Sequence, residues 1–468
     1  MKKLLCSALL LAMTLAAQAE VKLPKIFGDN MVLQQQTECN LWGTADANKV
    51  VKVRASWNGK TYKTQADAQG KWAMKIETPQ AGGPYELSLS DGEELKLHNI
   101  CSGQSNMEMP MKGFKAQPVA GTPEELMLCK DQQLRLFTVQ RNAQLHPVDT
   151  VAGDWKEADA ASVREFSAAA YYYGKTLRQS LGVPVGLIVI SWGGSACEAW
   201  INGNLIKSDW LKAFPKLHTP WNEADVKKYQ QRCPSALYNG MLHPLIGYTM
   251  KGVIWYQGED NCNRYATYAD QMQTLVNSWR KEWKQGIFPF YYCQIAPYDY
   301  SLIKWKNNSA LLREKQMEAE KRISNCRMAV LLDVGLEYGI HPRKKKEVGE
   351  RLALLSLANT YGQKGLPDFA VYKSVEFKGD TAVVSFDRSK EWVYFNNGPK
   401  SDNFEIAGED QVFHKAQAWI SRNKVYVKSE DVKKPVAVRY AFKNWVVGDL
   451  FHDGLPVSSF RTDDWEVK

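Results

Sequence analysis

The sequence lacks a long apolar run beyond its N-terminal region, because no later segment approaches the roughly 18 apolar residues that a membrane-spanning helix needs. It also lacks internal repeats and low-complexity segments. Of its 468 residues, 44% are hydrophobic, a fraction typical of proteins with large buried cores. This composition excludes a disordered or collagen-like chain, and the length predicts two or three domains.

Cysteine spacing typical of metal sites is missing as well. The nine cysteines are spread widely, with no C-x-x-C pair and no Cys/His cluster, so the sequence predicts no metal site and no cofactor. Cys6 lies in the N-terminal segment, and the pairing of the other eight stays open. Cys293 lies in an apolar, strand-like run and is predicted to be a buried free thiol.

The N-terminal segment is typical of a cleaved secretory signal. Lysines at positions 2 and 3 precede an apolar run over residues 4–17, which is followed by an A-x-A site and Glu20. We therefore expect residues 1–19 to be a signal peptide and the mature protein to be soluble, in the periplasm or outside the cell. Its removal lowers the formal charge from +9 to about +7.

Three regions of different pattern follow the signal. Residues 20–97 contain short alternating strands separated by turns, which predicts a small antiparallel β-domain. In residues 98–365, apolar runs alternate with segments of helical periodicity, which predicts an α/β domain whose parallel sheet is covered on both faces. Residues 366–468 return to a β-rich pattern.

The central region supplies the clearest element boundaries. The expected strands are Leu134–Val139, Val185–Ser191, Gly252–Tyr256, Phe288–Ile295 and Met328–Asp333. The expected helices are Ser162–Gln179, Tyr265–Trp283, Ser309–Arg322 and Lys344–Tyr361. Because open parallel sheets bind ligands outside the carboxyl ends of their strands, the turns after these strands are the places to look for a site.

Ser105 lies in the first such turn, in the segment Cys101–Met109. A serine between a strand and a helix is exposed, and the helix N-terminus offers free N–H groups to a developing oxyanion. Taken alone, the residue fits a helix N-cap equally well. The turn is not a G-x-S-x-G elbow, because Met107 stands where the second glycine belongs.

Two further turns carry groups that suit the same chemistry. Gly193 and Gly194 follow the strand Val185–Ser191, where paired glycines allow a close backbone approach to a ligand or simply a tight turn. An amide, two carboxylates and a second amide follow the next strand, at Gln257, Glu259, Asp260 and Asn261. A solvated loop would also contain such residues, so these turns count only in combination.

A histidine in the fourth turn is the predicted general base. His341 follows the strand that ends near Asp333, and from a strand-end loop it can reach a serine in a neighbouring loop. Among the seven histidines, His243 is the alternative, but its apolar neighbours favour a structural role.

Several blocks, in order along nearly the whole mature chain, resemble the sialate O-acetylesterase family, a branch of the SGNH (GDSL-like) hydrolases. They are Leu97–Met109, Val183–Ile188 with Trp192–Gly194, Leu237–Met241, Ile254–Glu259 with Asn261, Ile340–Pro342 with Gly349 and Arg351–Ala353, and Ser459–Trp465. The resemblance implies a serine esterase with a flavodoxin-like α/β/α core. It also implies Ser105 as nucleophile and His341 as base.

The same resemblance implies the remaining roles. The oxyanion donors would be the Ser105 N–H, a glycine of the pair Gly193–Gly194, and the amide of Gln257 or Asn261. SGNH enzymes usually carry Asp three residues before the His, but this sequence has Tyr338 there. Three groups are therefore candidates for orienting His341. Glu259 is the leading candidate, Asp333 is the second, and a backbone carbonyl is the third.

The resulting prediction is a metal-independent hydrolase that removes O-acetyl groups from a sugar, above all sialic acid. One alternative is an esterase for another acetylated carbohydrate such as acetylxylan. Another is a carbohydrate-binding or scaffold protein with an inert α/β core. Nucleic-acid binding is not predicted, because the one dense basic run, Arg343–Lys346, is typical of a solvated helix start. A weaker alternative for this run is attraction of the sialate carboxylate.

Overall fold

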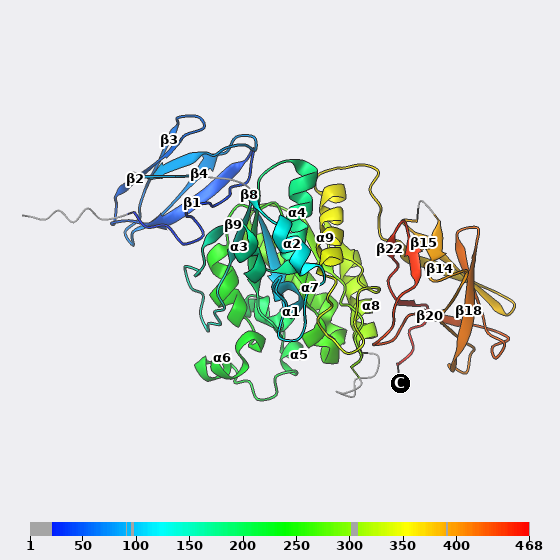
Figure 1. Ribbon diagram of the computed structural model, residues 1–468. Helices are drawn as coiled ribbons and strands as arrows, with labels where there is room; N and C mark the ends of the chain where they lie inside the picture. Colours follow the sequence, from blue (N-terminus) through cyan, green and yellow to red (C-terminus); the bar gives the residue numbers. More distant parts are fainter. Residues whose placement is uncertain (1–20, 90, 95–97, 301–307, 390–391, 468) are drawn as a thin grey trace, which may run out of the picture.

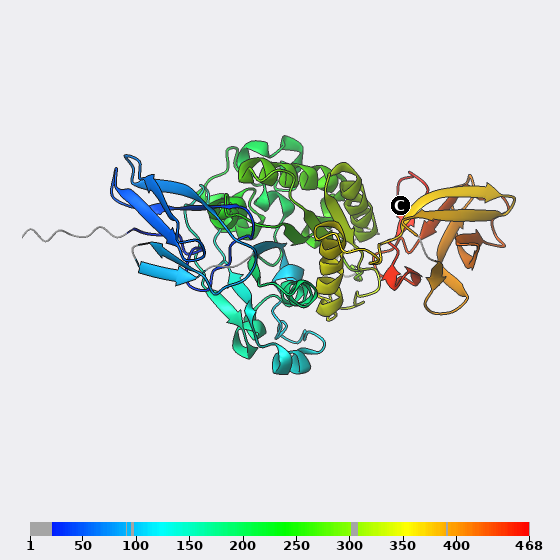
Figure 2. The ribbon, with the colours of Figure 1, turned by 90° about the horizontal axis from the view of Figure 1, so that it is seen from above.

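The computed structural model describes residues 21–89, 91–94, 98–300, 308–389 and 392–467 (Figure 1). The expected signal peptide lies outside these residues. Figures 1 and 2 show three parts that follow one another along the molecule, an N-terminal β region, a central α/β region and a C-terminal β region. Within the described residues, no helix combines the length and apolar character needed to cross a membrane.

The N-terminal region forms two small antiparallel sheets. β1 pairs with β4, and the second sheet has the order β3-β2-β5-β6. Residues of β2 alternate between buried and exposed, which directs one face of this strand into the core. The strands are β1 (Glu38–Thr44), β2 (Val50–Ala55), β3 (Thr61–Gln65), β4 (Lys71–Glu77), β5 (Glu86–Leu89) and β6 (Asp91–Glu94).

The central region contains a seven-stranded sheet with the order β13-β12-β11-β7-β10-β8-β9. All neighbouring strands are parallel except the edge pair β8 and β9. Every residue of β10 is buried, in keeping with its uninterrupted apolar sequence. The strands are β7 (His98–Gly103), β8 (Asp131–Thr138), β9 (Trp155–Ala158), β10 (Val185–Ser191), β11 (Val253–Tyr256), β12 (Phe290–Cys293) and β13 (Cys326–Ala329).

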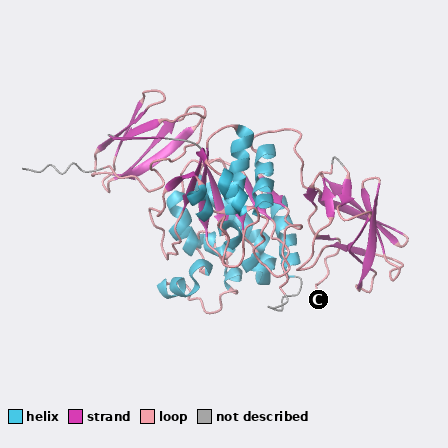
Figure 3. Ribbon diagram, in the orientation of Figure 1, coloured by secondary structure: helices cyan, strands magenta, loops and turns pink. Residues whose placement is uncertain are grey.

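Helices flank this sheet and complete the predicted α/β fold (Figure 3). α4 packs against α9, and α7 packs against α8. Gly349 of α9 allows the first contact, because a Cβ there would lie 2.6 Å from the Ala169 carbonyl oxygen. The helices are α1 (Ser105–Glu108), α2 (Thr122–Leu128), α3 (Ala160–Glu165), α4 (Ala168–Leu181), α5 (Ser208–Leu211), α6 (Glu223–Tyr229), α7 (Tyr268–Trp283), α8 (Asn308–Arg322) and α9 (Lys345–Asn359).

One predicted helix is divided in the structure, whereas the bounds of the other three predicted helices shift by at most three residues. The last predicted strand, Met328–Asp333, is found earlier, as β13. The expected helix Ser162–Gln179 is divided into α3 and α4, because Phe166 is extended and Ser167 begins a new helix. The Ser167 hydroxyl accepts a hydrogen bond from the Ala170 N–H at 3.1 Å, which caps α4. This local capping outweighs the continuous apolar periodicity of the segment.

The C-terminal region is a seven-stranded antiparallel sheet with a small three-stranded sheet beside it. It is attached to the core through buried Arg313 of α8, whose guanidinium donates to the Ser459 hydroxyl and to the Lys443 carbonyl. The strands are β14 (Val371–Lys378), β15 (Thr381–Asp387), β16 (Val393–Phe395), β17 (Lys400–Ala407), β18 (Phe413–Ser421), β19 (Lys424–Lys428), β20 (Ala437–Tyr440), β21 (Leu450–His452), β22 (Leu455–Pro456) and β23 (Phe460–Arg461).

The cysteines of the described residues are all free and all buried. Cys293 lies on strand β12 with no exposed surface, as the sequence predicted. Burial raises the pKa of the thiols, to about 12 for Cys39 and Cys233. The described residues also contain no group of three or more His, Cys, Asp or Glu side chains that could hold a metal ion.

Candidate active site

Three of the four turns singled out in the sequence meet at the centre of the sheet. β10 and β11 are the two neighbours of β7, and Gly103 at the end of β7 is aligned with Ser191 and with Tyr256. Gly103 has φ +145°, and a Cβ there would lie 2.2 Å from the Tyr256 carbonyl oxygen. A larger residue at position 103 would therefore push β7 and β11 apart, just before the turn that carries Ser105.

Ser105 is the first residue of α1 and is half-buried. Gln104 occupies the N-cap position, so the N-cap interpretation of Ser105 is wrong. Gly193 lies next to the serine, because a Cβ on Gly193 would be 3.3 Å from the Ser105 Cβ. The predicted nucleophile is thus at the N-terminal end of a helix and beside the glycine turn.

His341 is half-buried in the loop before α9, and its Nδ1 lies 2.5 Å from Oε1 of Gln117. Its ring also meets Phe114 edge-on, with 5.0 Å between the ring centroids. Because an amide oxygen only accepts, the contact places the imidazole proton on Nδ1 and leaves Nε2 as the acceptor that a general base needs. Burial lowers the pKa of His341 to about 4, and the nearby charge of Lys345 adds to this effect.

The two carboxylates that the sequence offered as partners of His341 are hydrogen-bonded to other side chains. Asp333 forms a bidentate pair with the guanidinium of Arg351, at 2.7 and 2.6 Å. Glu259 instead accepts a hydrogen bond from Nδ2 of Asn106 at 2.6 Å. Within the described residues, neither carboxylate is hydrogen-bonded to His341, whose Nδ1 faces a side-chain amide rather than a backbone carbonyl.

Sequence reasoning missed Gln117 completely. The residue lies in an irregular loop between α1 and α2, with no motif and no periodicity around it. It is separated from His341 by 224 positions. No local signal marks it, and only the folded arrangement brings the two side chains together.

The amides of Gln257 and Asn261 are not available to an oxyanion, so their prediction as donors is corrected. Both side chains are fully buried. Nε2 of Gln257 donates to the Ser195 carbonyl at 3.0 Å and to Oδ1 of Asn261 at 2.7 Å. Nδ2 of Asn261 donates to Glu198 and Gln271, each at 3.0 Å. These hydrogen bonds stabilise the turn after β11 from inside.

The two glycines of the turn after β10 differ in what their N–H groups contact. The Gly193 N–H donates to Oε2 of Glu108 at 2.7 Å, and Oε1 of the same carboxylate accepts from Nε of Arg141 at 2.7 Å. Gly194 adopts φ +70°. For the part of the chain that is described, the structure gives no hydrogen-bond acceptor to the N–H of Gly194 or of Ser105. Among the N–H groups predicted as oxyanion donors, these two are the ones without an acceptor in the described residues.

Lys345 corrects the interpretation of the basic run as a solvated helix start. It is the first residue of α9 and has no exposed surface, whereas Arg343, Lys344 and Lys346 are exposed. Its Nζ donates to Oδ1 of Asn106 at 2.6 Å. Burial lowers the pKa of this ammonium to about 7.

His243 lies outside this arrangement. Its Nδ1 contacts the Val148 carbonyl at 3.1 Å, which agrees with the structural role that its apolar neighbours predicted.

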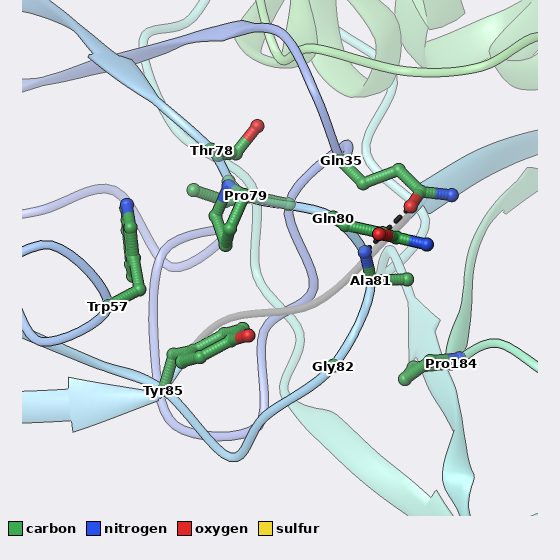
Figure 4. A pocket seen from close by; sticks show the side chains of 10 residues that line it. Gln35, Trp57, Thr78, Pro79, Gln80, Ala81, Gly82, Tyr85 and Pro184 are labelled. Atoms are coloured by element: carbon green, nitrogen blue, oxygen red, sulfur yellow. Dashed lines mark hydrogen bonds between the residues drawn. The ribbon is translucent and has the colours of Figure 1, made fainter.

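A small pocket lies elsewhere, at the edge of the N-terminal β region (Figure 4). The rings of Trp57 and Tyr85 meet edge-on inside it at 5.8 Å. Gln35 accepts a hydrogen bond from the Ala81 N–H, and Pro184 of the central region closes one side. None of the predicted catalytic residues lines this pocket.

The pH dependence of the site follows from His341. Because its pKa is lowered to about 4, the imidazole is neutral and able to accept a proton at every pH well above 4. We expect kcat/KM for p-nitrophenyl acetate to stay level from about pH 7 to 5 and to fall roughly tenfold per pH unit below about 4. A limb near pH 6.5 in a protein that is still folded by circular dichroism would contradict this assignment.

The contact between Gln117 and His341 gives a second prediction. Gln117→Leu keeps the side-chain volume but removes the acceptor that holds the Nδ1 proton, so the imidazole loses its fixed orientation. We expect kcat for p-nitrophenyl acetate to fall by roughly 10- to 100-fold with little change in KM. Gln117→Glu keeps an acceptor and should retain much of the activity. Equal activity of the Leu variant and the wild type would show that Gln117 does not orient the base.

Comparison with known proteins identifies the family of the chain. Residues 97–355 match the family model described as carbohydrate esterase, sialic acid-specific acetylesterase. The chain is 28% identical to the sialate O-acetylesterase of Rattus norvegicus over 404 residues, covering 72% of this chain and 73% of the relative. The human sialate O-acetylesterase is 28% identical over 382 residues, with 72% and 71% covered.

A solved structure extends the similarity to the β-rich flanks. A carbohydrate acetylesterase from Xanthomonas citri superimposes with a TM-score of 0.85 and is 33% identical. The match covers 95% of this chain and 100% of that one. With the family model spanning more than half of the chain, these findings identify the protein as a carboxylic ester hydrolase that belongs to the sialic acid-specific acetylesterase family of carbohydrate esterases.

Proposed function

We propose that this ester hydrolase removes O-acetyl groups from sialic acid through an acetyl-enzyme formed on Ser105. The observation that carries the proposal is the placement of Ser105 at the carboxyl end of the central strand β7, with His341 held in the tautomer of a general base. Relatives named sialate O-acetylesterase support the choice of substrate. Membership in an ester hydrolase family overturns the alternative of an inert carbohydrate-binding scaffold.

In the proposed mechanism the reaction has two halves. The Ser105 hydroxyl attacks the acetyl carbonyl carbon while Nε2 of His341 takes its proton, and the oxyanion forms against the N–H groups of Ser105 and Gly194. The ester C–O bond then breaks, and His341 returns the proton to the departing sugar oxygen. In the second half, His341 takes a proton from water, the hydroxide adds to the acetyl-serine, and acetate leaves as Ser105 is reprotonated.

The proposal is tested with O-acetylated sialic acid as the substrate. Purified protein should release acetate from it, and a fluorophosphonate probe should label Ser105 and block the release in proportion to the labelling. Labelling without acetate release from this substrate would retain the serine mechanism and exclude the sialate. Acetate release that continues in fully labelled protein would exclude Ser105.

A second candidate substrate is another acetylated carbohydrate, such as acetylxylan. The observation in its favour is the carbohydrate acetylesterase from Xanthomonas citri, which matches nearly the full chain, both β-rich flanks included, at a higher identity than the sialate esterases. The kcat/KM values for O-acetylated sialic acid and acetylxylan, measured on one preparation, separate the two. The larger value identifies the preferred class.

We further propose that residues 1–19 direct export and that the mature enzyme acts in the periplasm or outside the cell. The basic start, the short apolar run and the A-x-A site before Glu20 support this proposal. Mass spectrometry of the N-terminus in separated cell fractions tests it. A mature chain beginning at or near Glu20 outside the cytoplasm is the expected result, and an intact N-terminus in the cytoplasm would contradict it.

A further inference from the structure

A buried polar set lies next to the predicted nucleophile, and none of the esterase steps above uses it. It consists of Asn106 on α1, Glu259 in the turn after β11 and Lys345 at the start of α9. Their exposed fractions are 1%, 5% and 0%. Nδ2 of Asn106 donates to Oε1 of Glu259 at 2.6 Å, and Oδ1 of Asn106 accepts from Nζ of Lys345 at 2.6 Å.

The chemistry of the two charged groups determines which way the Asn106 amide faces. An ammonium only donates hydrogen bonds, and an ionised carboxylate only accepts them. The amide therefore turns its oxygen to Lys345 and its NH₂ to Glu259. The reverse orientation would set N–H against the ammonium and the carbonyl oxygen against the carboxylate, which is costly in a buried site.

The same NH₂ makes a second hydrogen bond that reaches the other half of the site. Nδ2 of Asn106 also donates to the Ile340 carbonyl at 3.1 Å. Asn106 directly follows Ser105, and Ile340 directly precedes His341. One side chain thus joins the turn that carries the nucleophile to the loop that carries the base, across 234 positions of sequence.

We propose that Asn106 is a positioning residue that fixes the separation of Ser105 and His341, and that Glu259 and Lys345 act through it by locking its amide orientation. The inference rests on the proposed serine esterase mechanism and adds a role for the carboxylate that does not touch His341. The inference also gives a reason for the burial of Lys345 near the predicted base His341. The Lys345 ammonium holds the Asn106 oxygen, so that the Asn106 NH₂ faces the Ile340 carbonyl.

The charges around Lys345 give this role a measurable signature. Its ammonium lies 5.5 Å from the centroid of the Tyr256 ring of β11. Burial lowers the pKa of this ammonium, and Glu259 and Cys293 of β12 raise it by a smaller amount. Asp260 faces Glu259 from the same turn and raises the pKa of that carboxyl, together with the larger effect of burial. On the loop side, the charge of Lys345 lowers the pKa of His341. Removal of that charge should therefore raise the pKa of His341.

The first experiment is steady-state kinetics of Lys345→Met and Glu259→Gln on p-nitrophenyl acetate. We expect kcat to fall by roughly 10- to 100-fold in each variant with KM nearly unchanged, because a misplacement of about 1 Å can cost about 10²-fold. In Lys345→Met the acid limb of kcat/KM should also move to higher pH. Lys344→Met, an exposed neighbour on the same turn, is the matched control and should leave both kcat and the limb unchanged.

A pair of variants then tests Asn106 itself. Asn106→Asp places a carboxylate against Glu259, and combination with Glu259→Gln restores complementary partners for both Lys345 and residue 259. Neither variant can donate to the Ile340 carbonyl. The double variant should therefore regain the thermal stability lost in Asn106→Asp but keep a kcat at least about tenfold below that of the wild type.

The outcomes distinguish this inference from the proposed function. If the double variant is as active as the wild type, or if Lys345→Met and Lys344→Met have the same kcat and the same acid limb, the positioning role is wrong. If Ser105→Ala keeps its activity, the serine mechanism itself is wrong. Should Asn106→Asp fail to fold alone, Lys345→Met still decides the question, because it leaves Asn106 in place.

Discussion

Ser105→Ala should lower kcat for p-nitrophenyl acetate by about 10³-fold or more. The remaining activity would come from substrate binding and from the oxyanion donors, which still act when the nucleophile is absent. The serine is the one hydroxyl at the N-terminus of α1, beside Gly193 and at the end of the central strand β7. No acyl-enzyme can form without its oxygen. The fold should be unaffected, because the structure shows the serine side chain in no hydrogen bond among the described residues.

The matched control is Ser102→Ala on the same strand. The Ser102 hydroxyl is buried and donates to the Ile190 carbonyl at 3.0 Å, so its loss should affect stability more than chemistry. Both variants are compared by kcat, by fluorophosphonate labelling and by circular dichroism. A Ser105→Ala protein that turns over substrate like Ser102→Ala would refute the nucleophile.

His341→Ala should produce a loss of similar size, about 10³-fold in kcat, because Ser105 then has no base to take its proton. The truncated side chain leaves space beside Phe114 and Gln117 where free imidazole can bind. Added imidazole should therefore restore part of the lost activity, and the restored rate should increase with the fraction of neutral imidazole. Such a pH dependence identifies proton transfer rather than repair of the fold.

His243→Ala serves as the control for this variant. Its ring contacts the Val148 carbonyl and lies outside the site, so we expect kcat within a few-fold of the wild type and no response to imidazole. If His243→Ala showed the large loss and His341→Ala did not, the assignment of the base would be reversed. Equal, small losses in both would mean that neither histidine is the base.

Much of the central fold could be predicted from sequence because its signals are local. The strand Val185–Ser191 has the predicted bounds, since a parallel strand buried on both faces is an unbroken apolar run. The placement of Ser105, Gly193 and Gln257 after three neighbouring strands follows from the same pattern. The split of the helix at Phe166 was not predicted, because a single capping hydroxyl outweighs an apolar periodicity that continues through it.

The hydrogen-bond partners of the site residues were much less predictable from the sequence. Ser105 and His341 stand in recognisable blocks, but the partner of His341 is Gln117, an amide from an irregular loop that no pattern marks. Lys345 looked like a surface charge because its neighbours in sequence are basic and exposed. Its real partner Asn106 is 239 positions away, and only three-dimensional contact reveals the hydrogen bond.

The burial of all eight described cysteines has a consequence for how long the enzyme lasts in an oxidising compartment. The thiolate is the form that reacts with oxidants and disulfides, and burial both raises the thiol pKa and blocks access. An unfolded chain loses both protections at once and exposes eight thiols that can cross-link at random. The working lifetime of the protein in such a compartment is therefore set by its rate of unfolding, and each unfolding event risks becoming irreversible.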